Sequence, residues 1–112
     1  MLETSIVVLG LISGITAYVV SSTTDLEALS NSQRLVEMLV ELQEPFTEVD
    51  LTQPTVVTLD VISAISGTVT LPQLFFGDRF VGNFSVVKDL HQKQKLTSVL
   101  LYQGRNKNKN MH

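Results

Sequence analysis

The stretch Leu71–Ser85 reads LPQLFFGDRFVGNFS, and its pattern is the strongest structural signal in the chain. Leu74–Phe76 and Phe80-Val81 are short apolar runs with strand composition, and the Gly77-Asp78 pair between them is typical of a tight turn. Pro72 has no N–H to donate to a strand ladder, so we expect it at the entrance of the first strand. The stretch therefore predicts a β-hairpin.

The end of the same stretch predicts a helix start. Gly82-Asn83 permits an unusual backbone angle, and Ser85 is a good N-cap for the residues that follow. We therefore expect a helix from Ser85 to about Gln94. Any β-hairpin followed by a helix would show this pattern, so the alternative of an unrelated hairpin stays open.

Length and composition restrict the class of protein. The chain has 112 residues, of which 44% are hydrophobic, so we expect a single domain with a core of its own. The formal net charge is −3. A mildly acidic chain is a poor match to nucleic acid, so we expect no nucleic-acid partner.

The chain contains no cysteine. This removes disulfides, thiolate metal sites and thiol redox chemistry together, and it leaves the redox compartment undetermined. The histidines are His91 and His112, which are too few for a histidine-based metal site. Asp50, Asp60 and Asp78 lack the spacing of paired catalytic carboxylates or of a metal cage. We therefore predict no catalytic residue and no metal ligand.

The N-terminal part of the chain is uncharged over residues 4–24, a span of 21 positions. That length could cross a bilayer as a helix, but Ser, Thr and Gly residues dilute the apolar content and no basic residue precedes the run. We expect two β segments instead, Ile6–Leu9 and Ile15–Ser21, with Thr16–Val20 as the buried first strand. Residues 1–14 then form an apolar extension, and a signal or anchor segment is the alternative.

A helix is predicted from Thr24 to about Gln43. Thr24 and Glu27 have the spacing of a capping box, in which the threonine caps the helix and the glutamate reaches back. Apolar residues recur at helical spacing, at positions 35, 36, 39, 40 and 42. Pro45 ends the helix, and Phe46–Asp50 alternates like a strand. The order of strand, helix and strand predicts a right-handed crossover between parallel strands.

The remaining elements are two helices and a tail. Pro54 suits the start of a helix over Thr55–Ser66, a segment rich in β-branched residues, and Gly67 ends it. Residues 96–102 are expected to form a short last helix. Residues 103–112 are polar, and we expect them to be a disordered tail.

This order of elements resembles the glutaredoxin-like branch of the thioredoxin fold. In that family a residue-proline pair, with the proline cis, precedes a β-hairpin, and a glycine-containing turn leads into the last helices. Leu71–Phe75 and Phe80–Gly82 match the pattern, whereas Asn83 stands where many members carry a second glycine. The resemblance implies an α/β, thioredoxin-like fold over residues 15–102, with a four-stranded mixed β-sheet flanked by helices on both faces.

The resemblance does not extend to the glutaredoxin active site. Members of the family place a cysteine at the start of the first helix, where the helix N-terminus lowers the thiol pKa. Aligning back from residues 45–51 puts that motif at residues 29–32, which read Leu-Ser-Asn-Ser. Ser32 has a hydroxyl, but an alcohol is hard to ionise and no nearby base is evident. We therefore expect a redox-inactive glutaredoxin relative and no enzyme.

A cysteine-poor branch of the family is the better match. Residues 18–22, Ser32-Gln33 and Phe46–Asp50 resemble the SH3-domain-binding glutamic-acid-rich-like proteins, and the likeness covers about residues 15–101. It implies a cytoplasmic adaptor or modulator that binds other proteins. Thr70–Gln73 holds one proline, whereas an SH3 ligand of the PxxP type needs two. The acidic tail of some members is also missing.

The resemblance also implies candidate binding residues. Glutathione-binding members pair the backbone before the cis proline with the peptide, and its γ-glutamyl carboxylate meets the glycine turn and the next helix N-terminus, which suits an anion. The matching positions are Leu71, Pro72, Gly82, Asn83, Ser85 and Val86. They imply a groove for glutathione or an extended peptide. The alternative is that the hairpin and the helix cap need these residues for structure alone.

Other features are assigned to the surface or the core. The basic positions Lys88, His91 and Lys93 are expected on a solvated face. The aromatic cluster, Phe75, Phe76, Phe80 and Phe84, is expected in the core, with Phe75 or Phe76 as an alternative partner surface. An exposed apolar edge strand within residues 1–14 would favour a homodimer. We expect no membrane association.

Overall fold

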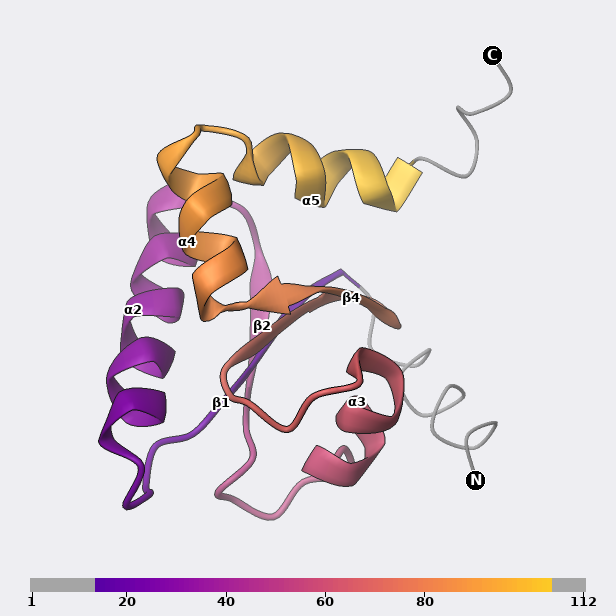
Figure 1. The fold of residues 1–112 in the computed structure, drawn as a ribbon. Coiled ribbons are helices and arrows are strands. Elements are labelled where there is room, and N and C mark those ends of the chain that lie inside the picture. Colours follow the sequence, from indigo (N-terminus) through magenta and orange to yellow (C-terminus); the bar gives the residue numbers. More distant parts are fainter. Residues whose placement is uncertain (1–13, 106–112) are drawn as a thin grey trace.

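The computed structural model describes residues 14–105. Its centre is a four-stranded sheet in the order β2-β1-β3-β4 (Figure 1). The strands are β1 (Ile15–Val19), β2 (Phe46–Asp50), β3 (Gln73–Phe76) and β4 (Arg79–Asn83). β1 and β2 are parallel, whereas β1–β3 and β3–β4 are antiparallel. The predicted parallel pair, hairpin and mixed sheet are thus confirmed.

Helices cover both faces of this sheet, as predicted (Figure 1). One face of the sheet packs against three of them, α2 (Leu26–Leu42), α4 (Phe84–Gln92) and α5 (Leu96–Arg105). The other face packs against α3 (Leu59–Ser66). α5 runs three residues past its expected end at position 102, because the single glycine at 104 costs only about 1 kcal/mol and does not stop a helix.

Some predictions concern residues that the structure does not describe. The expected strand over residues 6–9 and the dimer contact within residues 1–14 fall on, or almost wholly on, that part of the chain. The same holds for the tail beyond Arg105. Within residues 14–105, no helix combines the length and the apolar content needed to span a bilayer.

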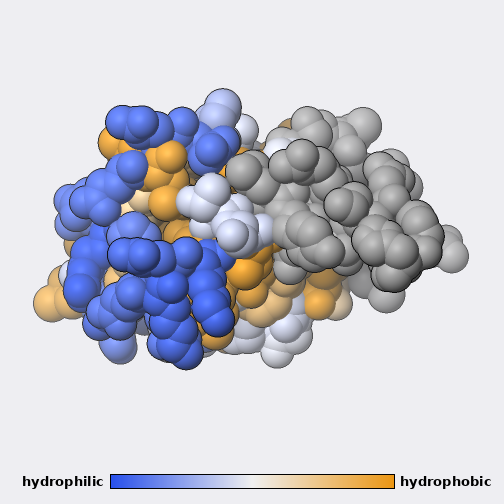
Figure 2. Space-filling view, turned by 90° about the horizontal axis from the view of Figure 1, so that it is seen from above, coloured by the Kyte–Doolittle hydropathy of each residue, from blue (hydrophilic) through white to orange (hydrophobic). Residues whose placement is uncertain are grey.

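The larger core lies between the sheet and helices α2, α4 and α5. Successive strand residues point to opposite faces, so the odd positions of β1, Ile15, Ala17 and Val19, face these helices. They meet Leu35 and Leu39 of α2, which are at most 1% exposed. The outer surface on the α2 and α4 side is largely hydrophilic (Figure 2), as expected for amphipathic helices.

The smaller core lies between the sheet and α3. Tyr18 and Phe75 are fully buried there, with their ring centroids 5.3 Å apart in an edge-to-face arrangement. Val57 and Ile62 complete the buried set. Phe76 points to the opposite face and packs, partly buried, against the larger core. The expectation that the aromatic cluster is core is therefore confirmed for Phe75.

α3 begins at Leu59, four residues later than predicted. Its N-cap is Thr58, and Pro54 lies in the preceding turn region. The reason is that Val57 is 1% exposed in the smaller core, and the segment before the helix bends at residues 56–57 to place it there. β-branched residues also favour extended backbone over helix. Gly67 ends the helix with a left-handed φ of 78°, as predicted.

Candidate functional site

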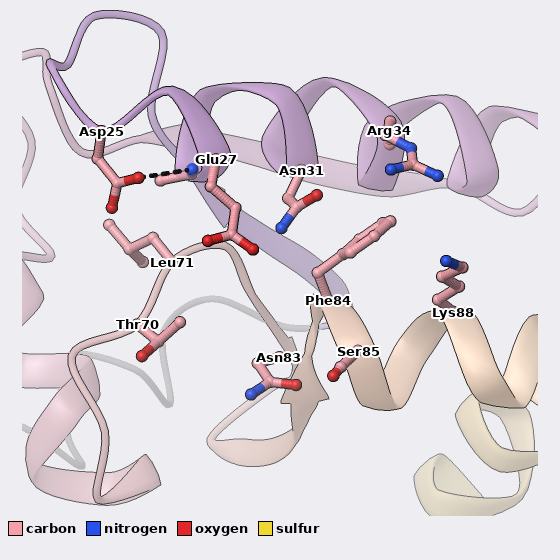
Figure 3. Close-up of a pocket in the computed structure, with 11 residues that line it drawn as sticks. Asp25, Glu27, Asn31, Arg34, Thr70, Leu71, Asn83, Phe84, Ser85 and Lys88 are labelled. Atoms are coloured by element: carbon pink, nitrogen blue, oxygen red, sulfur yellow. Dashed lines mark hydrogen bonds between the residues drawn. The ribbon is translucent and has the colours of Figure 1, made fainter.

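A groove of about 370 Å³ lies between the start of α2, the Thr70-Leu71 loop and the start of α4 (Figure 3). It is the place where the hairpin stretch and the first helix meet. Phe84 is buried at its base, and polar side chains form its walls. The groove is the candidate functional site.

One wall of the groove comes from a polar stripe on α2. Glu27, Asn31 and Arg34 follow one another at spacings of four and three residues, which places them on one face of the helix. From the sequence we predicted only the apolar stripe of α2 and not this polar one. The spacing was available in the sequence, but nothing there showed that this face would border a groove.

The N-terminus of α2 is capped by a carboxylate. Asp25 has extended backbone, and its Oδ1 accepts a hydrogen bond of 3.1 Å from the Ala28 N–H. The prediction of Thr24 as the cap is therefore wrong by one residue. Asp25 can reach the Ala28 N–H, and its charge adds a favourable interaction with the helix dipole. The positive end of α2 is thus already occupied by the chain's own anion.

The predicted position of the lost cysteine motif needs correction. Residues 29–32 lie inside α2, because the helix begins at Leu26. The helix start itself, where the family places its thiol, is taken by the Thr24-Asp25 segment. Ser32 is 2% exposed, and its Oγ accepts a hydrogen bond of 3.2 Å from the Val20 N–H. Ser32 therefore holds α2 against the end of β1.

The loop before β3 is held in place by hydrogen bonds from a buried side chain. The Leu71-Pro72 bond is cis, as the resemblance implied. The buried Gln73 side chain donates hydrogen bonds to the Thr68 and Thr70 carbonyls, at 2.9 and 3.1 Å. Within residues 14–105, neither the N–H nor the carbonyl of Leu71 has a hydrogen-bond partner. These two groups remain available at the edge of the groove.

The third wall is the start of α4, which is capped by Asn83. The Asn83 Oδ1 accepts a hydrogen bond of 3.2 Å from the Val86 N–H. The prediction of Ser85 as the cap is wrong, because the helix begins one residue before it and Asn83 already reaches the third N–H. Ser85 instead lies exposed in the first turn, beside the groove.

Gly82 is needed for space and not for an unusual backbone angle. Neither Gly82 nor Asn83 has a positive φ. A Cβ on Gly82 would lie 2.7 Å from Cγ1 and 2.8 Å from Cβ of Val86, well inside normal contact distance. The absence of a side chain at position 82 therefore lets the first turn of α4 pack directly on the end of β4.

The structure brings only part of the predicted site set together. Leu71, Asn83 and Ser85 line the groove, whereas Pro72, Gly82 and Val86 do not. Pro72 and Gly82 are buried, and Val86 is 46% exposed outside the groove. The other lining residues were not predicted as site residues, namely Asp25, Glu27, Ala28, Asn31, Arg34, Thr70, Phe84 and Lys88.

The charged side chains of the groove are grouped by sign at its two ends. Asp25 and Glu27 lie at the end near Leu71, and Arg34 and Lys88 lie at the other end (Figure 3). The guanidinium carbon of Arg34 is 5.2 Å from the centre of the Phe84 ring, a cation–π distance. Lys88 is partly buried at this wall, so the prediction of a fully solvated face is incomplete for it.

A small hydrogen-bonded cluster fixes the loop that leads into α2. The Thr52 N–H and hydroxyl both donate to Asp50 Oδ1, and Thr52 Oγ1 is 3.1 Å from the Ser21 hydroxyl. Desolvation alone would raise the pKa of Asp50, but hydrogen bonds from Ser21 and Thr52 outweigh it and hold the pKa below its usual value. Within residues 14–105 no group of acidic or histidine side chains could hold a metal ion.

Comparison with known proteins defines the fold. No family model and no curated relative matches the sequence. A buckwheat glutaredoxin in complex with glutathione superposes with a TM-score of 0.71 at 16% identity, covering 92% of this chain and 93% of that one. Reduced glutaredoxin C1 from Populus tremula x tremuloides also gives 0.71, at 15% identity, covering 89% and 85%. A mutant of actin interacting protein 5 gives 0.61 at 18% identity, covering 85% and 95%.

These likenesses, at low identity, concern the fold. The chain has the glutaredoxin-like form of the thioredoxin fold, and the fold class implied by the sequence is confirmed. It carries this fold without any cysteine. The cysteine-based thiol chemistry of glutaredoxins therefore has no nucleophile here.

Proposed function

We propose that this chain is a non-enzymatic protein-interaction module that binds an extended segment of another protein in the groove. Two features support this. The chain has no cysteine, and the helix start that would activate a thiol is capped by the Asp25 carboxylate. A carboxylate there would raise a nearby thiol pKa and not lower it. The site is thus arranged for binding and not for thiol chemistry.

The observation that carries the proposal is the free backbone of Leu71. Its N–H and carbonyl lack partners within the described part of the chain and lie beside a groove with polar walls. An extended peptide can satisfy both groups by pairing in the manner of a β-strand. Main-chain pairing supplies affinity in this mode, and the groove walls supply specificity.

Glutathione is the second candidate ligand. The buckwheat glutaredoxin with this fold is a glutathione complex. The start of α4 together with Arg34 and Lys88 offers a cationic end for one carboxylate. Glutathione, however, carries a carboxylate at each end, with an ammonium group beside the one on its γ-glutamyl end. The opposite end of the groove holds Asp25 and Glu27, which favour the ammonium and repel that carboxylate. The groove therefore matches one half of glutathione, and a regulatory glutathione-binding domain ranks second.

The finer class that we propose is the SH3-domain-binding glutamic-acid-rich-like type of adaptor. Its support is the lack of cysteine and the sequence likeness over residues 18–22 and 46–50. Since Thr70–Gln73 has a single proline, we expect partners other than SH3 domains. Binding of a panel of SH3 domains with micromolar affinity would contradict that expectation.

The test is an amide NMR titration of the full chain with reduced glutathione and, separately, with a pool of short extended peptides. Peptide binding should shift the Leu71 and Asn31 amides, while millimolar glutathione should shift only the Ser85 and Lys88 region or nothing. Glutathione shifts across the whole groove without any peptide effect would replace the adaptor proposal with the glutathione one. Turnover of a dithiol or mixed-disulfide substrate above the uncatalysed rate would overturn the non-enzymatic proposal.

A further inference from the structure

We infer that the groove recognises the order of two opposite charges in the bound segment: an acidic and a basic side chain four residues apart, on the same face of the extended peptide. This inference rests on the proposed function, since it specifies the peptide that the same groove takes. The observation behind it is the separation of the groove's own charges, with Asp25 and Glu27 at one end and Arg34 and Lys88 at the other (Figure 3).

These four charges form no salt bridge with one another or with any other side chain in residues 14–100. The salt bridges in that range join His91 to Glu41 and Lys93 to Asp89, all outside the groove. Asp25 accepts a hydrogen bond from the Ala28 N–H through Oδ1, and its side chain is solvent-exposed. Unpaired charges on both ends make the groove a ready partner for complementary charges on a ligand.

The spacing of the two ends sets the length of the ligand motif. Glu27 and Arg34 are seven residues apart on α2, which corresponds to about 10 Å along a helix axis. An extended peptide advances roughly 3.3 Å per residue. Successive side chains of an extended peptide point to opposite faces, so two side chains that enter the same groove lie an even number of residues apart. Oppositely charged side chains four residues apart span about 13 Å and can therefore reach both ends of the groove, with the backbone between them beside Leu71.

The charge order also distinguishes a peptide from glutathione. The acidic end of the groove favours a Lys or Arg side chain and repels a carboxylate, while the cationic end does the reverse. Glutathione has a carboxylate at each end, and the one on its γ-glutamyl end stands beside an ammonium group. At the acidic end of the groove, attraction of the ammonium and repulsion of the carboxylate therefore oppose each other. A segment with one acidic and one basic residue satisfies both ends in a single orientation.

The experiment compares two capped eight-residue peptides of identical composition, GSEVTSKG and GSKVTSEG, which differ only in charge order. Their affinities are measured by NMR titration, following the Glu27, Asn31 and Leu71 amides. Each exposed charge contact contributes little by itself, so we expect the preferred order to bind about fivefold more tightly. The charge-swap variant, Glu27→Lys with Arg34→Glu, should prefer the opposite order.

Two variants control for indirect effects. Asp78→Lys with Lys95→Glu is a matched swap at exposed positions outside the groove, and it should leave the preference of the wild type unchanged. Should the groove swap fail to fold, Glu27→Gln with Arg34→Gln takes its place and should remove the preference altogether. Circular dichroism verifies that each variant keeps the helical content of the wild type.

The outcomes separate the inference from the proposed function. Equal affinity for the two peptides, with shifts at Leu71, overturns the inference and leaves the peptide-binding function in place. A preference that the groove swap does not reverse also overturns it. No shift with either peptide at millimolar concentration overturns the inference and, with the peptide pool equally silent, the proposed function as well.

Discussion

The N-termini of α2 and α4 border the same groove, yet they have opposite electrostatic character. α2 begins with a carboxylate cap and a further acid in its first turn, Asp25 and Glu27. α4 begins with a neutral amide cap, Asn83, has no acid in its first turn, and lies beside Arg34 and Lys88. Both caps satisfy the third free N–H of their helix. The difference lies in charge alone.

The two helices show that a side-chain N-cap can either remove or preserve the attraction of a helix N-terminus for anions. A helix N-terminus attracts anions, because its free N–H groups and dipole point outward. An ionised cap cancels that attraction by its negative charge. An amide cap accepts a hydrogen bond from one N–H but leaves the partial positive charge of the helix N-terminus in place. The N-terminus of α2 is thus closed to anions, and the N-terminus of α4 remains open to them.

The largest effect is expected from Gly82→Ala, which disturbs the α4 side. The new Cβ would collide with Val86, whose Cβ and Cγ1 lie within 2.8 Å of it, so α4 must shift. Overpacking of this kind costs about 1–3 kcal/mol of unfolding free energy. Urea denaturation measures the loss. Adding Val86→Ala should recover part of it, and strictly additive losses in the double variant would contradict the proposed collision.

Asp25→Ala should cost about 1 kcal/mol, because the Ala28 N–H loses its acceptor. Asp25→Asn keeps the cap and removes the charge, so its stability should stay within about 0.5 kcal/mol of the wild type. The same Asn variant should weaken the binding of the preferred charged peptide. Thermal denaturation and the NMR titration check the two effects. A larger loss for Thr24→Ala than for Asp25→Ala would restore Thr24 as the cap.

Asn83→Ala should lower the free energy of unfolding by about 0.5–1 kcal/mol, a little less than Asp25→Ala, because the Asn83 cap carries no charge. Asn83→Asp should keep the cap and make the α4 end resemble the α2 end, so binding of an acidic side chain there should weaken. Ser85→Ala should change the unfolding free energy by less than about 0.5 kcal/mol, since Ser85 is exposed and does not cap the helix. Equal losses for Asn83→Ala and Ser85→Ala would contradict this assignment.

The smallest effect is a pH dependence confined to the α2 side. The pKa of Asp50 is lower in the folded state, so its stabilising contribution is present above the unfolded pKa, near 3.8, and is lost as pH falls through the folded pKa. The Ser21 and Thr52 amides should shift in that acidic range, while the Val86 amide, capped by a neutral Asn83, should not. Thr52→Ala should move the Asp50 titration toward its ordinary pKa. Identical titration in the variant would contradict the hydrogen-bonded cluster.

Much of the fold could be predicted from local sequence signals. The hairpin follows from the Gly77-Asp78 turn between apolar runs, and Gly77 indeed has a φ of 61°. The parallel pair follows from the strand, helix and strand order. The helix starts were less accurate, because several neighbouring residues can act as caps. Which of Thr24 and Asp25 reaches a free N–H depends on backbone geometry that no local pattern specifies.

The candidate site was predicted only where it lies on the hairpin stretch. Leu71, Asn83 and Ser85 were named in advance, because family resemblance and local chemistry both pointed to them. The α2 wall was missed, although Asn31 and Arg34 share a helical face with Glu27. A polar face of a helix is usually solvent-exposed, so the sequence offered no reason to single this one out.

The sequence by itself determined what chemistry this chain lacks and which elements it forms. The absence of cysteine excludes thiol catalysis, and the periodicity and turn residues specify a mixed sheet with helices on both faces. Only the tertiary structure decided where charges gather. Residues 25–34 and residues 70–88 are distant in the chain, and they share a groove because α2 and α4 pack on the same face of the sheet. Charge separation across that groove is a property of this packing, which no local pattern encodes.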